Sequence, residues 1–189
     1  IKAKNHEIAK IPTFGEKSEH DILQALQEYK SGKTKSSRMT LPYAAEIAEK
    51  IVNYLKQSSD IVAVVPLGSL RRMMPTVGDI DIAVATNNPL KAIEHFASYP
   101  YKERIIERGD ITSSILLNGG KQVDLMVLEP HQLGSLLQHF SGSKEHNIRL
   151  REFAIKKGYS LSEKGIKLKN GDIKKFDTEE KFYNFLGLD

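Results

Sequence analysis

Residues 67–85 read LGSLRRMMPTVGDIDIAVA and contain the densest group of chemically informative side chains in the sequence. Two carboxylates, Asp79 and Asp81, lie two residues apart in a run that is otherwise apolar. Because side chains on a β-strand alternate between its faces, we expect both aspartates to point one way while Ile80 and Ile82 point into the core. Two like charges this close repel each other unless a cation neutralises them, and all-oxygen sites suit Mg²⁺ or Mn²⁺. The pattern therefore predicts a divalent-metal site.

The residues before the aspartates favour a phosphate site. Gly68 and Ser69 begin a turn after the apolar run 61–65, and Arg71 and Arg72 follow. Glycine lets backbone N–H groups approach a phosphate, and a hydroxyl and a guanidinium can complete its binding site. Metal carboxylates beside a phosphate site indicate metal-assisted phosphoryl or nucleotidyl transfer. The simpler alternative, a strand with two solvated aspartates, does not explain the glycine, serine and arginines in the same short span.

The composition is that of an ordinary globular protein, with 189 residues, 40% hydrophobic and 28% charged. The sequence has no cysteine, which excludes disulfides and thiolate metal sites and favours an intracellular setting. It has no apolar run of membrane-spanning length and no secretory signal. The net charge of +4 is compatible with nucleic-acid binding. The first residue is Ile rather than Met, so we expect an excised fragment.

Sequence patterns up to residue 130 predict a short mixed sheet with helices packed on it. Asp124 is expected on the opposite face of its strand from Val123. As a third carboxylate on a neighbouring strand, it can complete a two-metal site. We expect Ser18 to cap the second helix of a helical hairpin around residues 8–17. The other expected elements are helices beginning at Pro42 and Asn88-Pro89, and strands at 61–65, 101–108, 111–117 and 122–128.

The sequence changes character after residue 130, where short helices and strands are expected. Asn147 and Arg151 lie one turn apart on one of these helices and can reach the edge of a nucleic-acid groove. The expected elements are helices at 131–140 and 144–157, a break at 141–143, strands at 160–161 and 166–168, and a last helix that begins at 177–178.

Taken together, these motifs resemble DNA polymerase family X, the polymerase beta-like enzymes, in their bacterial form. The matching stretches are GSLRR (68–72), VGDID (77–81), QVDL (122–125), HFSGSKEHN (139–147), LSEKG (161–165) and TEEKFYNFLGL (178–188), with IPTFGEK (11–17) resembling the hairpin of the fingers. Gly-Ser with Asp-x-Asp is shared by the wider nucleotidyltransferase superfamily, whereas Phe-Ser-Gly-Ser is more specific to polymerases.

The resemblance implies an α/β (α+β) fold in three parts. Residues 1–37 would be a partial helix–hairpin–helix of the fingers and a linker. Residues 38–130 would be a nucleotidyltransferase-type palm with a mixed sheet, and residues 131–189 a small α+β thumb that contacts nucleotide and template.

The resemblance also implies a role for each matching residue. Asp79 and Asp81 would hold both metals, and Asp124 the catalytic one beside the primer 3′-hydroxyl, whose proton a carboxylate can take up. The implied nucleotide-binding residues are Gly68, Ser69, Arg72 and Gly78 at the triphosphate, His139, Phe140 and Gly142 at the sugar, and Lys144 and Asn147 at the base. The implied DNA-binding residues are Phe14, Gly15 and Lys17 in the hairpin and Arg151 at the templating strand. Arg38 matches a further triphosphate-binding arginine.

Three residues depart from the family pattern. Met73 stands where glycine is common, Met126 where arginine is usual, and Gln122 where vertebrate-type enzymes have arginine. All three expected metal ligands remain, so we interpret the site as active.

The activity implied by the resemblance is template-directed DNA synthesis for short-gap repair, with two Mg²⁺ ions or Mn²⁺ and release of pyrophosphate. The implied partners are gapped or primed DNA and deoxynucleoside triphosphates. The protein would be a monomer that does not contact a membrane and that lies at the nucleoid in the bacterial cytoplasm. A stand-alone nucleotidyltransferase acting on a small molecule or protein explains residues 61–128 equally well, but not the helix break within 139–151. A non-catalytic DNA-end-binding module is disfavoured by the three aspartates.

Overall fold

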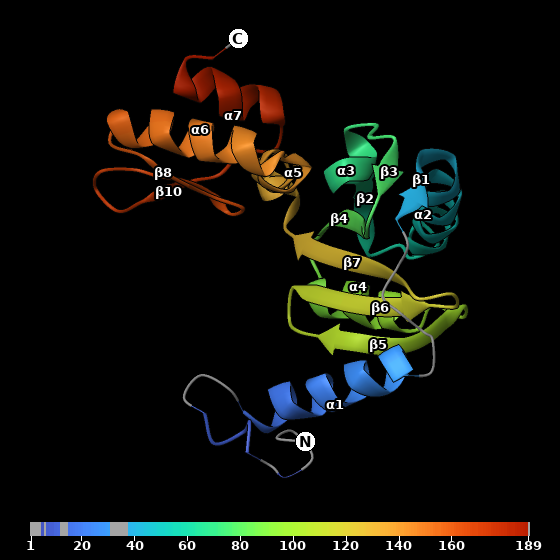
Figure 1. Cartoon of the computed structure of the whole chain (residues 1–189). Coiled ribbons are helices and arrows are strands. Elements are labelled where there is room, and N and C mark those ends of the chain that lie inside the picture. Colours follow the sequence, from blue (N-terminus) through green and yellow to red (C-terminus); the bar gives the residue numbers. More distant parts are fainter. Residues whose placement is uncertain (1–4, 6, 12–14, 31–37, 189) are drawn as a thin grey trace. The chain divides into compact units, whose positions relative to one another are not determined.

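The computed structural model describes residues 5, 7–11, 15–30 and 38–188 (Figure 1). The chain divides into two compact units, Ile1–Ser36 and Ser37–Asp189. The second unit contains every expected site residue except those of the hairpin.

The first unit contains α1 (Glu16–Lys30). The helix begins at Glu16, so Ser18 lies inside it and the predicted Ser18 cap is wrong. Glu16 and Glu19 place two negative charges in the first turn, where the helix dipole favours them. The Glu19 carboxylate is buried and accepts the backbone N–H groups of Ile8 at 2.9 Å and Ala9 at 3.0 Å. The centre of the predicted hairpin, residues 12–14, lies outside the described residues.

A five-stranded mixed sheet forms the centre of the second unit, as the sequence predicted. Its strand order is β2-β4-β7-β6-β5, and β4 and β7 run parallel while the other neighbours run antiparallel. The bounds are β2 (Ile61–Pro66), β4 (Ile80–Thr86), β5 (Lys102–Arg108), β6 (Thr112–Leu117) and β7 (Lys121–Leu128).

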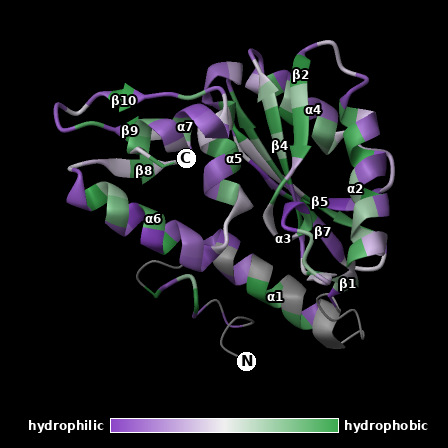
Figure 2. Cartoon of the chain, turned by 90° about the horizontal axis from the view of Figure 1, so that it is seen from above, coloured by the Kyte–Doolittle hydropathy of each residue, from purple (hydrophilic) through white to green (hydrophobic). Residues whose placement is uncertain are grey.

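Two helices, α2 (Leu41–Leu55) and α4 (Pro89–Ala97), cover one face of this sheet. Proline near the start of each fixes a helical φ where no intrahelical N–H bond is needed. Asn88 caps α4 by accepting the Lys91 N–H, as the Asn-Pro signal predicted. On α2 the buried residues recur every three or four positions, and Figure 2 shows the hydrophobic strands β2 and β4. No helix in the described part of the chain combines the length and apolarity needed to cross a membrane.

The opposite face of the sheet is covered at one end by α5 (Leu133–Ser141), which follows the short 3₁₀ helix η2 (Pro130–Gln132). Leu136 of α5 packs in one cluster with Ala83 and Leu128. Because β4 is covered on both faces here, its run from Ile82 onward is buried without alternation.

The C-terminal residues form a smaller layer of two helices on a three-stranded sheet of order β10-β9-β8 (Figure 1). The core of this layer is Leu150, Ala154, Ile166, Phe176, Phe182 and Leu186. The bounds are α6 (Lys144–Lys156), β8 (Ser160–Ser162), β9 (Gly165–Lys167), β10 (Ile173–Lys174) and α7 (Glu179–Leu186). Gly134 of α5 lies against the start of α7, where a Cβ would come within 2.2 Å of the Thr178 carbonyl carbon. Glycine therefore permits the close contact of these two helices.

Candidate active site

The parallel pairing of β4 with β7 places Asp81 directly beside Asp124. Ile80 and Ile82 are fully buried on the opposite face, as the alternation predicted. Asp79 precedes β4 by one residue and is exposed, so the prediction that it lies on the strand is wrong by one position. The strand therefore fixes the position of Asp81, and the loop before it carries Asp79.

The surroundings of Asp81 disfavour its ionised form. Burial, and then the charges of Asp79 and Asp124, raise the pKa of Asp81 to about 7, while the Arg72 guanidinium acts to lower it. Like charges held this close disfavour ionisation of all of them at once. A bound cation would relieve that repulsion.

The Asp124 carboxylate is held by two neutral donors. Ser114, its register partner on β6, donates its hydroxyl to Asp124 Oδ1 at 2.5 Å. The Gln122 amide nitrogen donates to Oδ1 at 3.0 Å and to Oδ2 at 3.2 Å. These three side chains share the sheet face opposite the helices, and sequence reasoning did not identify Ser114 as part of the site.

The phosphate turn predicted after β2 is the single-turn helix α3 (Gly68–Arg71). Gly68 adopts φ +56°, and a Cβ at this position would lie 2.2 Å from Asp81 Oδ2. Glycine therefore allows both the turn and the close approach of the Asp81 carboxylate.

These residues open into a pocket of about 430 Å³ between the large sheet and the C-terminal layer. It brings together both expected aspartates of the Asp-x-Asp pair and every expected nucleotide-binding residue. The lining residues are Arg38, Gly68, Ser69, Arg72, Gly78, Asp79, Asp81, His139, Phe140, Gly142, Lys144 and Asn147. Asp124 adjoins Asp81 but does not line the pocket.

Two arginines border the pocket from different elements. Arg72 follows α3 and donates to the Ser141 carbonyl oxygen. Arg38 precedes β1 (Met39–Thr40), which pairs with β3 (Thr76–Val77), and it donates to the Thr76 hydroxyl at 2.8 Å and carbonyl oxygen at 2.7 Å. The β1–β3 pair thus brings Arg38, distant in sequence, to the pocket.

The C-terminal side of the pocket carries His139 and Asn147. Burial, and then the nearby Arg151 charge, lower the pKa of His139, so its ring is neutral at pH 7. The ring packs edge-on against Phe140 with centroids 4.8 Å apart. Neutral His139 adds no charge to this side of the pocket.

The expected DNA-binding residues belong to both units of the chain. Arg151 is exposed on α6. Gly15 and Lys17 are exposed in the first unit, and Phe14 is not among the described residues.

Sequence comparison agrees with this arrangement. Residues 136–189 match the family model of the DNA polymerase beta thumb. Over 178 residues the chain is 38% identical to the DNA polymerase/3'-5' exonuclease PolX of Bacillus subtilis (strain 168). This alignment covers 93% of this chain and 31% of the Bacillus subtilis protein. The chain belongs to DNA polymerase family X. It is also 25% identical over 182 residues to DNA polymerase lambda of Rattus norvegicus, covering 80% of this chain and 31% of that protein. This family X chain thus spans about a third of the length of these relatives.

Solved structures share the fold. Two structures of Leishmania infantum polymerase beta, a ternary gap complex and a ternary P/T complex, align with TM-scores of 0.73 and 0.72 at 16% identity. They cover all of this chain, and the chain covers 77% and 84% of theirs. The second unit therefore has the polymerase beta fold expected of family X.

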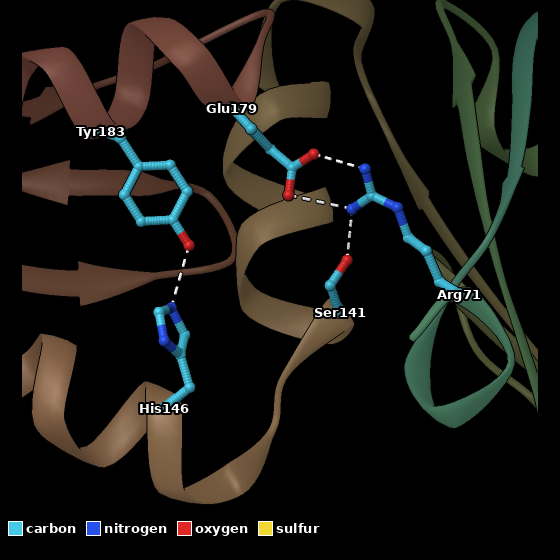
Figure 3. Close-up of polar contacts among 5 residues, drawn as sticks. All are labelled: Arg71, Ser141, His146, Glu179 and Tyr183. Carbon is cyan, nitrogen blue, oxygen red and sulfur yellow. Dashed lines mark hydrogen bonds and ion pairs between the residues drawn. The ribbon is translucent and has the colours of Figure 1, made fainter. Parts of the chain in front are cut away.

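A partly buried ion pair joins α3 of this family X chain to α7 (Figure 3). Arg71 donates to both carboxylate oxygens of Glu179 at 2.9 and 2.5 Å, and also to the Ser141 hydroxyl. The side chains of Arg71 and Glu179 are 32% and 25% exposed. No sequence pattern pairs residues this far apart, so the sequence did not reveal this contact.

The donor chemistry of the site fits the divalent metals on which family X depends. Within the described ranges, no three histidine, aspartate or glutamate side chains stand ready-made around a metal position. However, Asp79, Asp81 and Asp124 offer only carboxylate oxygens, which Mg²⁺ and Mn²⁺ prefer. The raised pKa of Asp81 comes first from burial of its carboxyl group and then from the charges of Asp79 and Asp124.

Proposed function

We propose that this chain is a template-directed DNA polymerase that adds deoxynucleoside triphosphates to a primer 3′-hydroxyl during short-gap repair. The observation that carries the proposal is the pocket, which joins the Asp79 and Asp81 carboxylates to the Ser69–Arg72 turn and to thumb residues. The relatives are named as DNA polymerases, and the Leishmania infantum structures are described as ternary gap and P/T complexes, which supports a DNA partner.

In this proposal the pocket binds the incoming nucleotide. Ser69, Arg72 and the backbone at Gly68 and Gly78 hold the triphosphate, because charge-assisted and N–H hydrogen bonds suit phosphate oxygens. His139, Phe140 and Gly142 line the sugar, while Lys144 and Asn147 lie at the base.

Asp124 acts on the primer. The primer 3′-oxygen attacks the α-phosphorus, its proton passes to an Asp124 carboxylate oxygen, and the bond from the α-phosphorus to the bridging oxygen breaks, so pyrophosphate leaves with the electron pair. Ser114 and Gln122 keep Asp124 in position through their three hydrogen bonds. Asp79 and Asp81 would hold two Mg²⁺ or Mn²⁺ ions, one shared with Asp124. When bound, these ions offset the triphosphate charge and acidify the attacking hydroxyl.

Contacts with DNA come from two regions. Phe14, Gly15 and Lys17 of the first unit bind the phosphate backbone without reading sequence, while Arg151 of the thumb contacts the templating strand. A monomer is sufficient for this function. We place this monomer at the nucleoid in the bacterial cytoplasm.

Primer extension tests the proposal. With Mg²⁺ or Mn²⁺, the chain should extend a primer across a one-nucleotide gap and lose this activity in Asp124→Ala. The matched control is Asp110→Asn, an exposed aspartate in the β5–β6 turn, which should extend normally. Transfer of a nucleotide to a small molecule or protein, with no extension of gapped DNA, would support the stand-alone nucleotidyltransferase instead.

A further inference from the structure

The side-chain amide of Asn147 is held at both ends. Its Nδ2 donates to the His139 carbonyl oxygen at 2.6 Å, and its Oδ1 accepts from the Gln138 amide nitrogen at 2.9 Å. A backbone carbonyl only accepts, so the Asn147 nitrogen must face His139. The Asn147 oxygen therefore faces Gln138, which must donate. The His139 carbonyl sets which way the Asn147 amide faces, and Gln138 holds the oxygen end of that amide in place.

Gln138 is anchored away from the pocket. It is 3% exposed on α5 and is not a lining residue. Burial raises the pKa of Tyr183, and a hydrogen bond with Gln138 acts to lower it, so Gln138 also contacts α7. The Tyr183 hydroxyl lies 3.0 Å from His146 Nε2 (Figure 3). Rotation of Gln138 would break contacts on both sides, which leaves buried polar atoms without partners.

The fixed orientation determines what Asn147 offers to a ligand. Nδ2 has two N–H groups, and only the bond to His139 occupies it among the described residues. The other N–H remains for a group bound in the pocket, which Asn147 lines. The minor-groove edges of bases carry acceptors at purine N3 and pyrimidine O2. A donor suits these atoms, whereas an amide oxygen in the same place would repel them.

We propose that Gln138 is a positioning residue that holds the Asn147 amide with a hydrogen-bond donor, rather than an acceptor, toward the minor-groove edge of the incoming nucleotide. The proposal rests on the proposed polymerase function. It makes a buried side chain outside the pocket a determinant of nucleotide recognition.

The test compares dATP with 3-deaza-dATP, in which a C–H group replaces the N3 acceptor. Dissociation constants are measured in Mg²⁺ with gapped DNA whose primer ends in a dideoxynucleotide, so that binding is separated from chemistry. Wild type should bind 3-deaza-dATP about threefold to tenfold more weakly, the range for one hydrogen bond. Asn147→Ala should bind both nucleotides with the same affinity.

Gln138→Met keeps the length of the side chain but removes the donor to Asn147 Oδ1. Asn147 then keeps only its bond to the His139 carbonyl and can turn away from the base, so the affinity ratio should fall toward one. Gln138→Glu is the second variant, used if Gln138→Met does not fold. The glutamate carboxylate offers only acceptors to Asn147, so we expect the affinity ratio to be one or below. The matched control is Gln132→Met, because Gln132 is also buried and its amide donates to the Lys164 carbonyl at 3.4 Å. This control should keep the wild-type ratio.

A wild-type ratio in folded Gln138→Met or Gln138→Glu overturns the proposal, as does equal binding of the two nucleotides by wild type. Failure of the polymerase function has a different signature, because wild type would then bind neither nucleotide in the ternary complex and extend no primer.

Discussion

Replacing Asp81 with asparagine removes a buried charge but preserves the shape of the side chain. In the folded chain, burial and the neighbouring charges of Asp79 and Asp124 raise the pKa of Asp81 to about 7, from an ordinary value of 3.8. The folded state therefore holds the proton more tightly than the unfolded state. Above pH 7, the ionised Asp81 carboxylate lowers the free energy of unfolding by its full amount. This destabilisation shrinks as the pH falls from 7 to 4, and it disappears below pH 4 because the carboxyl group is then protonated in both states.

The pKa difference sets the size of the effect. One pKa unit corresponds to about 1.36 kcal/mol, so the cost of the charge at pH 8 has an upper limit of about 4 kcal/mol. Water and salt ions reach the pocket and reduce this cost. We expect Asp81→Asn to raise the free energy of unfolding by about 1–3 kcal/mol at pH 8 and by close to zero near pH 4.

Urea unfolding in metal-free buffer at pH 8, 6 and 4.5 measures this difference, with Asp110→Asn as the control for an exposed carboxylate. The same Asp81→Asn protein should extend no primer and should gain less stability from Mg²⁺ than wild type. If Asp81→Asn is no more stable than wild type at pH 8, or if its advantage is the same at all three pH values, the electrostatic reasoning about the aspartates is wrong.

Four further outcomes are expected. Arg72→Ala should weaken nucleotide binding in the terminated ternary complex by about 1.5–3 kcal/mol, because it removes a guanidinium–phosphate contact; unchanged affinity would remove Arg72 from the phosphate site. A double-mutant cycle of Arg71→Ala and Glu179→Ala, followed by urea unfolding, should give a coupling free energy of about 1–3 kcal/mol, and additivity would contradict a working ion pair. Met73 has φ 55°, so Met73→Val should lower the unfolding free energy by about 1 kcal/mol while Met73→Gly should not; equal effects would argue against backbone strain there. Lys17→Ala should reduce the log–log salt slope of gapped-DNA binding by about one, measured by fluorescence anisotropy, and an unchanged slope would place Lys17 away from phosphate.

The sequence predicted those features that depend on local periodicity. Alternating residues placed Ile80 and Ile82 in the core and Asp81 on the other face, and the Asn88-Pro89 pair marked the start of α4. Parallel pairing of β4 with β7 then joins Asp81 to Asp124. Resemblance to family X supplied the remaining lining residues, including those of the thumb, which no periodicity identifies.

Features that depend on contacts between distant segments could not be predicted in this way. The start of α1 at Glu16 and the position of Asp79 before β4 show that element boundaries depend on tertiary context. Met126 stands where arginine is usual in the family. Its side chain packs against the apolar cluster under α5 and so adds an apolar contact between the sheet and that helix. Gln138 is polar, yet it is buried because its partners come from α6 and α7.

The adjacent Arg71 and Arg72 connect the pocket to the C-terminal layer. Arg71 pairs with Glu179 at the start of α7, while Arg72, the next residue, borders the pocket and donates to the Ser141 carbonyl. The Ser141 hydroxyl accepts from Arg71, so one serine contacts both guanidinium groups. The pocket is lined partly by residues 38–81 and partly by residues 139–147, so its shape depends on how these two segments are held together. A change that releases Arg71 from Glu179 therefore acts on this pocket through Ser141, although neither member of the ion pair lines it.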